Sequence, residues 1–414
     1  MVTGQPLDRP VIDPSVAPDT TRTLPLSLTE ALATAREQSF PVRSAGADTR
    51  RVRARKRQTL GVFLPRLTVS EEGATTTDPL NAFGFRLRQE SVTQADFAPA
   101  RLNDPERLTH FTTKVEVEQP LLNLDGIFQR RAAADAVRAA SWAERRTDAV
   151  VAFRVKKAYF GLVLAQRRLG VLDSALTAAR ANQRQAEALF DEGIINRADV
   201  LAARVRVSEL ESQRTQTSAR RRTAADRLRF LLGVPEVADI QPTDALTRER
   251  VRLDTVRVAR INQTRSDMQA LRSRADAAED QVRAAWMAFV PSLNAQGSYT
   301  WNDDQAFGSQ GQGYTVGAAL TWNVFSGAQQ IGGAQEAEAE LQQSRIEIEQ
   351  QALQNQVEVA EALRDLRASR QQIEQAETAV DQAEESLRIR SDRFAEGLAR
   401  TTDVLQAEAT LAER

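Results

Sequence analysis

Side chains that could perform covalent or metal chemistry are scarce in this chain. It contains one histidine, His110, and no cysteine. A Cys/His zinc site, a thiol nucleophile and a Ser-His-Asp triad are therefore excluded, although a site built from carboxylates alone stays open. Asp303 and Asp304 could bind a cation, but a polar hairpin loop explains them more simply. The sequence predicts no catalytic residue, no metal site and no cofactor.

The overall charge is balanced, with 55 basic and 56 acidic side chains among 414 residues. Such a balance does not favour nucleic acid as a partner. The arginine-rich stretch from Arg50 to Arg57 is interpreted as one solvated helix face. The longest apolar run, Ala284 to Val290, is far shorter than the roughly 20 residues that a spanning helix needs.

The most informative pattern is a pair of similar segments. Phe190 to Ala203 (FDEGIINRADVLAA) and Phe394 to Ala407 (FAEGLARTTDVLQA) share seven of fourteen residues, where chance gives about one. A second pair, FLPRLTVS from Phe63 and FVPSLNAQ from Phe289, shows the same relation. The chain is thus an internal repeat, and spacing differences predict 23 extra residues before Val115, in a surface loop.

Each repeat is predicted to run helix, strand, loop, strand, very long helix, tight turn and returning helix. The first repeat occupies 28–232: helix 29–60, strands 63–72 and 109–122 around a surface loop 73–108, long helix 127–191, tip 192–198 and return helix 199–232. The second occupies 251–414: helix 262–288, strands 291–302 and 312–325, long helix 328–395, tip 396–402 and return helix 403–414. An extended, proline-rich segment 1–27 and an equatorial linker 233–250 complete the chain.

Both ends of the chain give further expectations. Thr29 is the expected N-cap of the first helix. The first 27 residues include no apolar stretch of signal-peptide length, so either a signal was removed before this numbering or the protein is not exported by that route. The last return helix stops about 20 residues earlier than its counterpart, which indicates a truncation.

The predicted strands alternate between apolar and polar side chains. This period of two fits a soluble sheet with one wet face, but the strands of about 10 residues and their terminal aromatics favour a membrane barrel. The expected lipid-facing residues are Tyr299, Trp301, Tyr314, Leu320 and Trp322, and the expected lumen-facing residues are Lys114, Glu116 and Glu118. Four strands cannot close a barrel, so two chains would give eight strands and three would give twelve with an open lumen. A water-filled pore requires the trimer.

The long helices predict a coiled-coil region, because 65 residues would extend roughly 100 Å and a lone helix of that length is unstable. The turns at their ends are explained mostly by capping. Gly193 and Gly397 are expected to be left-handed, Asp403 is expected to form a capping box with Gln406, and Asn196 with Asp199. Capping leaves the exposed apolar residues Ile194, Ile195 and Leu398 unexplained, and they indicate a docking surface.

Taken in order, these motifs resemble the TolC family of outer-membrane efflux proteins. The resemblance rests on LPLSLTEAL at Leu24, the strand starts FLPRL and FVPSL, the strand exits QPLLN and WNVFSG, and the two turns EGIINRADVL and EGLARTTDVL. It implies a mainly α protomer with two repeats, four membrane β-strands and long coiled-coil helices. Three protomers would form a twelve-stranded β-barrel continued by an α-helical barrel.

The resemblance also implies function and partners. A homotrimer in the outer membrane, in contact with its lipid, would act as a passive duct for efflux or type I secretion, docked to a periplasmic adaptor (membrane fusion) protein and an inner-membrane pump. The implied docking tips are Gly193, Ile194, Ile195, Gly397 and Leu398. The implied aperture gate comprises Asp403, Arg400, Asp199, Arg197 and Gln406, where Gln406 replaces the family's second aspartate. The alternative function is a periplasmic coiled-coil adaptor or scaffold.

Overall fold

The computed structural model describes residues 23–234, 239–247, 260–396 and 398–414. They form two compact units, each assembled from distant parts of the sequence. Unit 1 takes the described residues that fall within 1–46, 144–261 and 354–414, and unit 2 takes 47–143 and 262–353. The two repeats therefore do not form one unit each, because both contribute to both.

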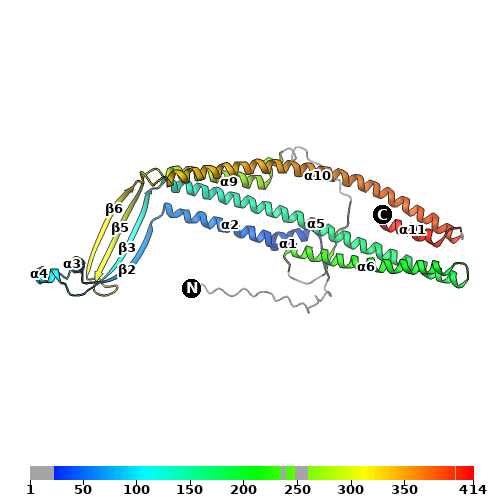
Figure 1. The fold of residues 1–414 in the computed structure, drawn as a ribbon, viewed down its shortest axis with the longest axis horizontal. Coiled ribbons are helices and arrows are strands. Elements are labelled where there is room, and N and C mark those ends of the chain that lie inside the picture. The colour runs from blue at the N-terminus through cyan, green and yellow to red at the C-terminus, as the bar shows by residue number, and fades with distance from the viewer. Residues whose placement is uncertain (1–22, 235–238, 248–259, 397) are drawn as a thin grey trace. The chain divides into compact units, whose positions relative to one another are not determined.

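Unit 2 contains one antiparallel sheet of four strands (Figure 1). The strands are β2 (Arg66–Thr76), β3 (Leu108–Leu122), β5 (Ser292–Asp303) and β6 (Gly311–Thr321), in the order β2-β3-β5-β6. Each repeat contributes one hairpin, and the pairing of β3 with β5 joins the two. The predicted strands exist, but β2 extends to Thr76, and β6 ends at Thr321, so Trp322 lies beyond the strand.

The predicted loop between β2 and β3 is partly helical. It contains α3 (Pro79–Arg88), the 3-10 turn η2 (Gln94–Phe97) and α4 (Pro99–Asn103). The sequence Asp-Pro starts α3, since the Asp78 carboxylate accepts a hydrogen bond of 2.9 Å from the Asn81 amide and Pro79 occupies the first turn. The segment between the two strands, predicted as a loop over 73–108, thus contains short helices that the sequence analysis did not predict.

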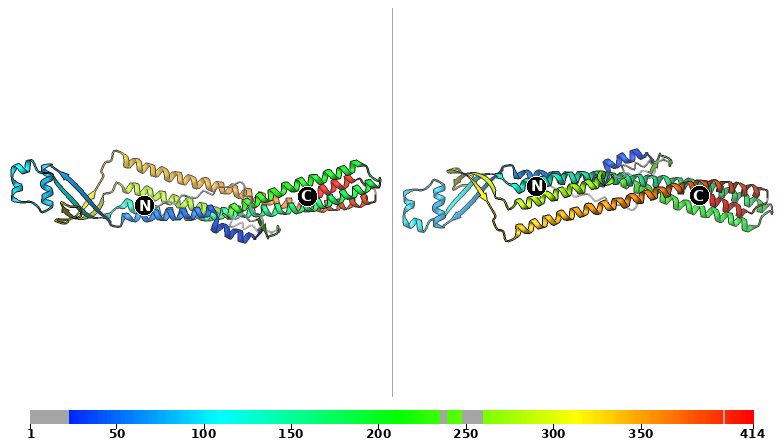
Figure 2. Two further views of the ribbon diagram at one scale, coloured as in Figure 1. Left: turned by 90° about the horizontal axis from the view of Figure 1, so that it is seen from below. Right: turned by 90° about the horizontal axis from the view of Figure 1, so that it is seen from above.

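Helices continue unit 2 from the other ends of the strands (Figure 2). They are the later part of α2 (Phe40–Gln58), the start of α5 (Leu124–Asp191), α8 (Ile261–Thr264), α9 (Ser266–Met287) and the start of α10 (Gln329–Ala395). Side chains tie neighbouring helices to one another. The Trp286 indole donates to Glu338 at 3.2 Å, and the Thr49 hydroxyl donates to the Ala140 carbonyl at 3.4 Å.

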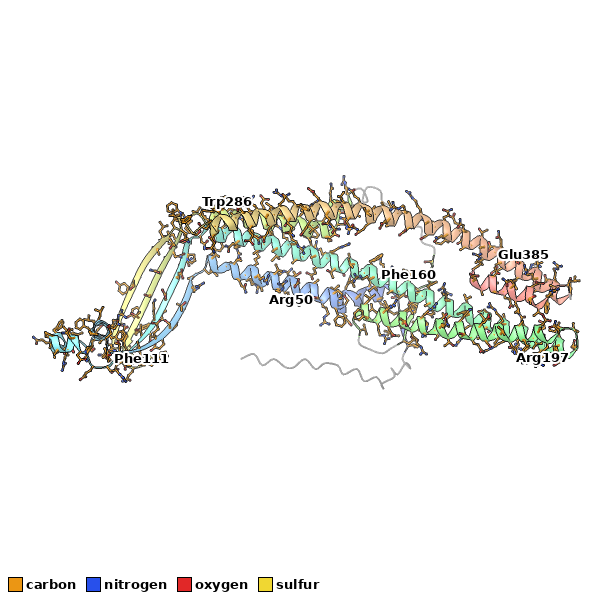
Figure 3. The ribbon with its side chains drawn as sticks, in the orientation of Figure 1. Arg50, Phe111, Phe160, Arg197, Trp286 and Glu385 are labelled. Atoms are coloured by element: carbon orange, nitrogen blue, oxygen red, sulfur yellow. The ribbon has the colours of Figure 1, made fainter. Side chains whose placement is uncertain are left out.

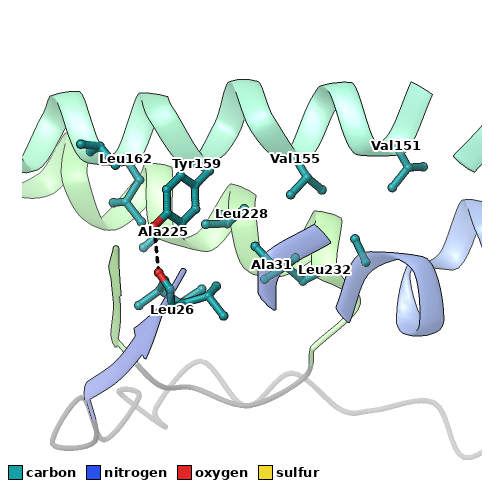
Figure 4. Close-up of a cluster of buried hydrophobic side chains, with 12 residues drawn as sticks. Leu26, Ala31, Val151, Val155, Tyr159, Leu162, Ala225, Leu228 and Leu232 are labelled. Carbon is teal, nitrogen blue, oxygen red and sulfur yellow. Dashed lines mark hydrogen bonds between the residues drawn. The ribbon is translucent and has the colours of Figure 1, made fainter. Parts of the chain in front are cut away.

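Unit 1 contains α1 (Leu28–Gln38), most of α5, α6 (Arg197–Leu232), the end of α10 and α11 (Thr401–Glu413). Its main core joins α1, α5 and α6 with two short strands (Figure 4). Tyr159 and Leu162 of α5 and Leu228 of α6 are completely buried in this cluster. Smaller clusters follow the α5–α6 hairpin outward, and the ion pair Arg180–Glu211, at 2.7 Å, links the same two helices.

The first predicted helix, 29–60, is interrupted. Ser39 is extended, with φ −61° and ψ 136°, between α1 and α2. Pro41 is the cause, because its ring would collide with the carbonyl four residues earlier in a continuous helix. The N-cap is Ser27 rather than Thr29. The Glu30 carboxylate accepts a hydrogen bond of 2.8 Å from the Ser27 amide, and the Ser27 hydroxyl accepts one of 3.3 Å from the Glu30 amide.

The predicted extended segment and the predicted linker meet in a parallel pair of strands. β1 (Thr23–Leu26) belongs to the expected extended segment, and β4 (Asp239–Pro242) to the expected linker. The rest of the expected N-terminal segment, 1–22, and the linker residues 235–238 and 248–250 lie outside the described residues.

Candidate functional surfaces: the two-faced sheet and the helical tips

The register of the sheet aligns like side chains into rows across all four strands. One row runs Leu67, Val117, Gly297, Val316, and the next apolar row runs Val69, Val115, Tyr299, Tyr314. Between them lies the polar row Thr68, Glu116, Ser298, Thr315. Because directly paired residues share a face, the alternation predicted for single strands becomes one apolar and one polar surface.

The apolar surface is largely uncovered. Val316 is 78% exposed and Tyr314 is 79% exposed. Leu320, which pairs with Leu293, lies next to the end of β6 rather than in the middle of the surface. An apolar sheet face open to this extent requires a covering layer, which the described residues of unit 2 do not provide.

Aromatic side chains mark both ends of this surface. Tyr299 and Trp301, with ring centroids 4.6 Å apart, pair with Val115 and Thr113 of β3, toward the strand ends where Figure 3 labels Phe111. At the helical end, where Figure 3 labels Trp286, the Trp322 indole donates to the Phe289 carbonyl at 3.0 Å. Eight residues at about 3.3 Å each separate Tyr314 from Trp322 by roughly 26 Å, close to the apolar thickness of a membrane barrel.

The polar surface bears the charged residues predicted for it. Lys114 and Glu116 form an ion pair of 2.9 Å along β3, and the strand register places Glu118 opposite Arg66 of β2. Half-exposed opposite charges in neighbouring rows are typical of a wet surface, where each pair contributes little stability. The three residues predicted to face a lumen therefore lie together on one face.

The first tip joins α5 to α6 in unit 1. Gly193 has φ +75°, and the Ile194 amide donates to the Leu189 carbonyl at 2.9 Å, which forms a Schellman cap. Asn196 caps α6, since its side-chain oxygen accepts from the Asp199 amide at 3.1 Å. Ile194 is 64% exposed at this tip. Ile195 differs, because it packs against the buried cluster of Ala186, Val200 and Ala203.

The second tip joins α10 to α11. Gly397 lies outside the described residues, while Leu398 beside it is 65% exposed. The capping arrangement differs from the predicted one. Asp403 does not precede the helix but lies in its first turn, where its carboxylate accepts from the Arg400 amide at 3.1 Å. Gln406 is exposed and has no part in this cap.

The expected gate residues all belong to unit 1, near the two tips, where Figure 3 labels Arg197. Arg197 and Arg400 are exposed, and Asp199 and Asp403 are partly exposed. In the described part of the chain, no ion pair joins these four residues to one another. Arg390, which the sequence reasoning missed, donates to the Asp403 backbone carbonyl at 3.2 Å. A single chain therefore presents the gate candidates without closing them on each other.

Behind the tips, α11 contacts the α5–α6 hairpin through Glu408. The Asn182 amide donates to the Glu408 carboxylate at 2.6 Å. Burial raises the pKa of Glu408 above its ordinary value, and the hydrogen bond from Asn182 and the charge of Arg206 oppose that rise. Neither residue stands out in the sequence, because their spacing of 226 positions becomes a contact only in the folded unit.

A second polar contact joins β1 and the start of α1 to α5. The Tyr159 hydroxyl lies 2.6 Å from an Asp244 carboxylate oxygen and 2.9 Å from the Leu26 carbonyl, and the same Asp244 oxygen accepts from the Leu28 amide at 2.7 Å. The Tyr159 hydroxyl, followed by the Leu28 amide, lowers the pKa of Asp244. This arrangement joins β1, the start of α1 and α5.

Within the described residues, no cluster of His, Asp or Glu side chains has the arrangement of a metal site. Among the helices described, none combines the length and the apolar character needed to cross a membrane.

The outer membrane efflux protein family model matches residues 31–234 and 258–414. Alkaline protease secretion protein AprF of Pseudomonas aeruginosa is 23% identical over 337 residues, covering 78% of this chain and 67% of AprF. Among solved structures, the CmeC outer membrane channel of Campylobacter jejuni has a TM-score of 0.79 at 15% identity, covering 93% of this chain and 80% of CmeC. The outer membrane protein VceC of Vibrio cholerae has a TM-score of 0.77 at 20% identity, covering 93% of this chain and 90% of VceC.

The fold and the family agree with the resemblance drawn from the motifs, and they favour a channel over an adaptor or scaffold. The family consists of transport ducts rather than enzymes. With its mainly helical, two-repeat fold and its two-faced sheet, this chain belongs to the outer membrane efflux protein family and is an outer-membrane channel for efflux or secretion that extends into the periplasm.

Proposed function

We propose that three copies of the chain form a passive duct, which receives cargo from an inner-membrane pump through a periplasmic adaptor. The observation that supports it most directly is the sheet, with one apolar and one polar face and two unpaired edges, β2 and β6. In hydrocarbon, unpaired edge groups cost several kcal/mol each, so the edges must pair with other copies.

The two unpaired edge strands match in length and in direction. β2 and β6 each have 11 residues, and because all neighbours in the sheet are antiparallel, β6 of one copy meets β2 of the next in antiparallel orientation. Two copies would make eight strands, whose interior side chains fill. Three copies make twelve strands and leave a lumen lined by Lys114, Glu116 and Glu118.

The helices give separate support for assembly. Phe153, Phe160, Leu164 and Val171 of α5 are between 38% and 66% exposed. At 100° per residue these four lie within about 40° of each other, so they form one apolar stripe along the helix. Helices of neighbouring copies would cover this stripe in an α-helical barrel, with no catalytic step required.

The assembly is tested by outer-membrane fractionation followed by gel electrophoresis without and with heating. We expect a trimer that resists detergent at room temperature and dissociates to a 45.8 kDa chain on heating. A monomer in the outer-membrane fraction, or a chain found only in soluble fractions, would contradict the proposal.

The tips are the proposed adaptor-docking surface. Ile194 and Leu398 are exposed in the protomer, and covering each would contribute about 1.5–3 kcal/mol. Three copies provide six such contacts, enough for avidity. The double variant Ile194→Asp, Leu398→Asp should abolish export and adaptor crosslinking while the trimer level stays unchanged.

Ile195→Asp provides the contrast, because Ile195 packs inside the hairpin and its substitution should lower the trimer level itself. Normal export and crosslinking in the double variant would show that docking occurs elsewhere. The Gly193 and Gly397 positions are proposed to shape the tips, and Asp403, Arg400, Asp199, Arg197 and Gln406 to surround the aperture.

The cargo class follows from two different relatives. AprF is named for the secretion of a protease, and the solved CmeC structure is described as an outer membrane channel. We infer that this duct serves either efflux or type I secretion, with cargo chosen by the pump.

A further inference from the structure

The helical insert between β2 and β3, residues 77–107, is a folded element with its own interior. Asp96 is 5% exposed and accepts from the Thr93 hydroxyl at 2.7 Å, while Arg86 and Arg101 lie 3.7 Å and 3.8 Å from its other oxygen. Phe83 and Phe97 pack edge to face at 5.7 Å. The insert therefore holds a defined position.

That position is set by an anchor on the sheet. The buried Gln89 side chain, directly after α3, donates to the backbone carbonyls of Thr109 at 3.0 Å and Asp303 at 3.1 Å. Phe85 of α3 stacks on His110, with ring centroids 4.2 Å apart. The Thr112 hydroxyl lies 2.9 Å from Nε2 of the His110 ring.

The anchor lies on the polar face of the sheet. His110 and Thr112 belong to the same alternating set of β3 as Lys114 and Glu116. The Arg88 carbonyl also approaches Gly311 of β6 so closely that an added Cβ would lie 1.9 Å from it. The end of α3 thus packs over β3 and the start of β6 on that face.

The opposite side of α3 is apolar and uncovered. At 100° per residue around the axis of α3, Leu80 and Leu87 point about 180° away from the direction in which Phe85 and Gln89 point. Leu80 is 81% exposed and Leu87 is 53% exposed. Because Phe85 and Gln89 contact the polar face, Leu80 and Leu87 are directed away from it.

We propose that Leu80 and Leu87 meet the same residues of the other copies on the channel axis, so that the three inserts constrict the outer mouth of the duct. This inference rests on the proposed trimer, in which the polar faces surround the axis. Twelve strands spaced about 4.8 Å apart and tilted about 40° enclose a backbone circle about 24 Å across. Three helices about 10 Å thick against the inner wall of such a circle touch each other.

The occupant of the apolar side of α3 is thus a second copy of this chain rather than lipid. Lipid would contact the opposite face of the sheet, where Val316 and Tyr314 are exposed. The position of the anchor decides between the two occupants.

Cysteine crosslinking tests the contact directly, because the parent chain has no cysteine. Leu87→Cys in the full-length protein should form disulfide-linked pairs in the outer membrane under mild oxidation, involving about half of the chains or more. Val316→Cys, on the lipid-facing rows, should give none. A heat-sensitive trimer in which Leu87→Cys stays uncrosslinked, even with a short bis-maleimide, would overturn the inference and leave the proposed trimer standing. Loss of the trimer in the parent would instead refute the proposed function.

Access from outside tests the constriction independently. Ser298→Cys places a thiol on the polar face, in the same row as Glu116. A maleimide-polyethylene glycol of about 2 kDa, added to whole cells, should label it at least tenfold faster when an Asn-Gly turn joins Thr76 directly to Leu108 in place of the insert.

A second variant serves as a control in case the shortened hairpin misfolds. Leu80→Asp with Leu87→Asp keeps the anchor and places six carboxylates around the axis, where they repel each other. It should also accelerate labelling at Ser298→Cys. Equal labelling rates with and without these changes, in variants that form normal trimers, would overturn the inference.

Discussion

At the scale of single residues, Tyr159 joins three segments of unit 1 through one buried hydroxyl. Tyr159→Phe keeps the packing of the ring and removes the hydrogen bonds to Asp244 and the Leu26 carbonyl. We expect it to lower the stability of the protein by about 1–2 kcal/mol at neutral pH, as a buried hydrogen bond typically contributes. Thermal unfolding in detergent, followed by circular dichroism, measures the change. Tyr314→Phe, at an exposed position, is the matched control and should unfold like the parent.

The same contact has a defined pH dependence. The pKa of Asp244 is lowered in the folded chain, so its stabilising effect is present above the ordinary Asp pKa of about 4 and is lost as the pH falls through the lowered value. The difference between Tyr159→Phe and the parent should therefore shrink below about pH 4. A difference that grows in acid would contradict the assigned charge state.

Glu408 has the opposite behaviour. Its pKa is raised from 4.5, so the folded chain binds the proton more tightly than the unfolded chain. The cost of ionising it is absent below pH 4.5 and appears as the pH rises through the raised value. Glu408→Gln should therefore slow hydrogen exchange across residues 401–413 severalfold at pH 7.5 and leave it unchanged at pH 4.5. Glu413→Gln, at the exposed end of α11, should change neither rate.

At the scale of the elements, the sheet makes a sharp prediction about its two faces. Val316, on an apolar row and far from either end of β6, faces lipid in the proposed barrel, while Thr315 faces the lumen. Val316→Arg should cost roughly 2–4 kcal/mol per chain and block assembly, and Thr315→Arg should be tolerated. The amount of heat-sensitive trimer in outer-membrane fractions measures both. A soluble sheet with one wet face would not show this asymmetry in membrane insertion.

Capping also acts at the element scale and separates two roles of Asp403. Its carboxylate accepts from the Arg400 amide, so part of its effect is to start α11 rather than to line an aperture. Asp403→Asn retains an acceptor oxygen but removes the charge, whereas Asp403→Ala removes both. Variants at this position should therefore be compared with each other before any change is attributed to the aperture.

At the scale of the whole molecule, the duct is predicted to have two constrictions in series, one at the aperture and one at the outer mouth. When only one constriction is widened, the other still limits the conductance of the duct. In planar bilayers, conductance should rise modestly with Asp403→Ala and Arg400→Ala, and modestly when the insert is replaced by a turn. Both changes together should raise it by more than the sum of the two increments. Simple additivity, or a large and unchanging conductance in the parent, would contradict the arrangement.

Much of this architecture follows from local patterns in the sequence. The seven identities between the tip segments reveal the repeat, and alternation in β5 and β6 predicts which side chains share a face. These features are readable because they depend on neighbours a few positions apart. The break at Ser39 is also a local feature, since Pro41 cannot continue a helix, although the helix predicted over 29–60 does not include it.

The remaining features depend on contacts between residues far apart in the sequence, so they appear only in the folded chain. Gln89 is polar and unremarkable in sequence, yet it holds the insert to carbonyls of β3 and β5 that lie 20 and 214 positions away. Ile195 resembles Ile194 in type, but the packing of α5 on α6 partly buries Ile195 and leaves Ile194 exposed. Periodicity determined which face of each element is apolar. Which other element covers that face, or leaves it open, depends on how the chain brings remote segments together, and no local pattern encodes that choice.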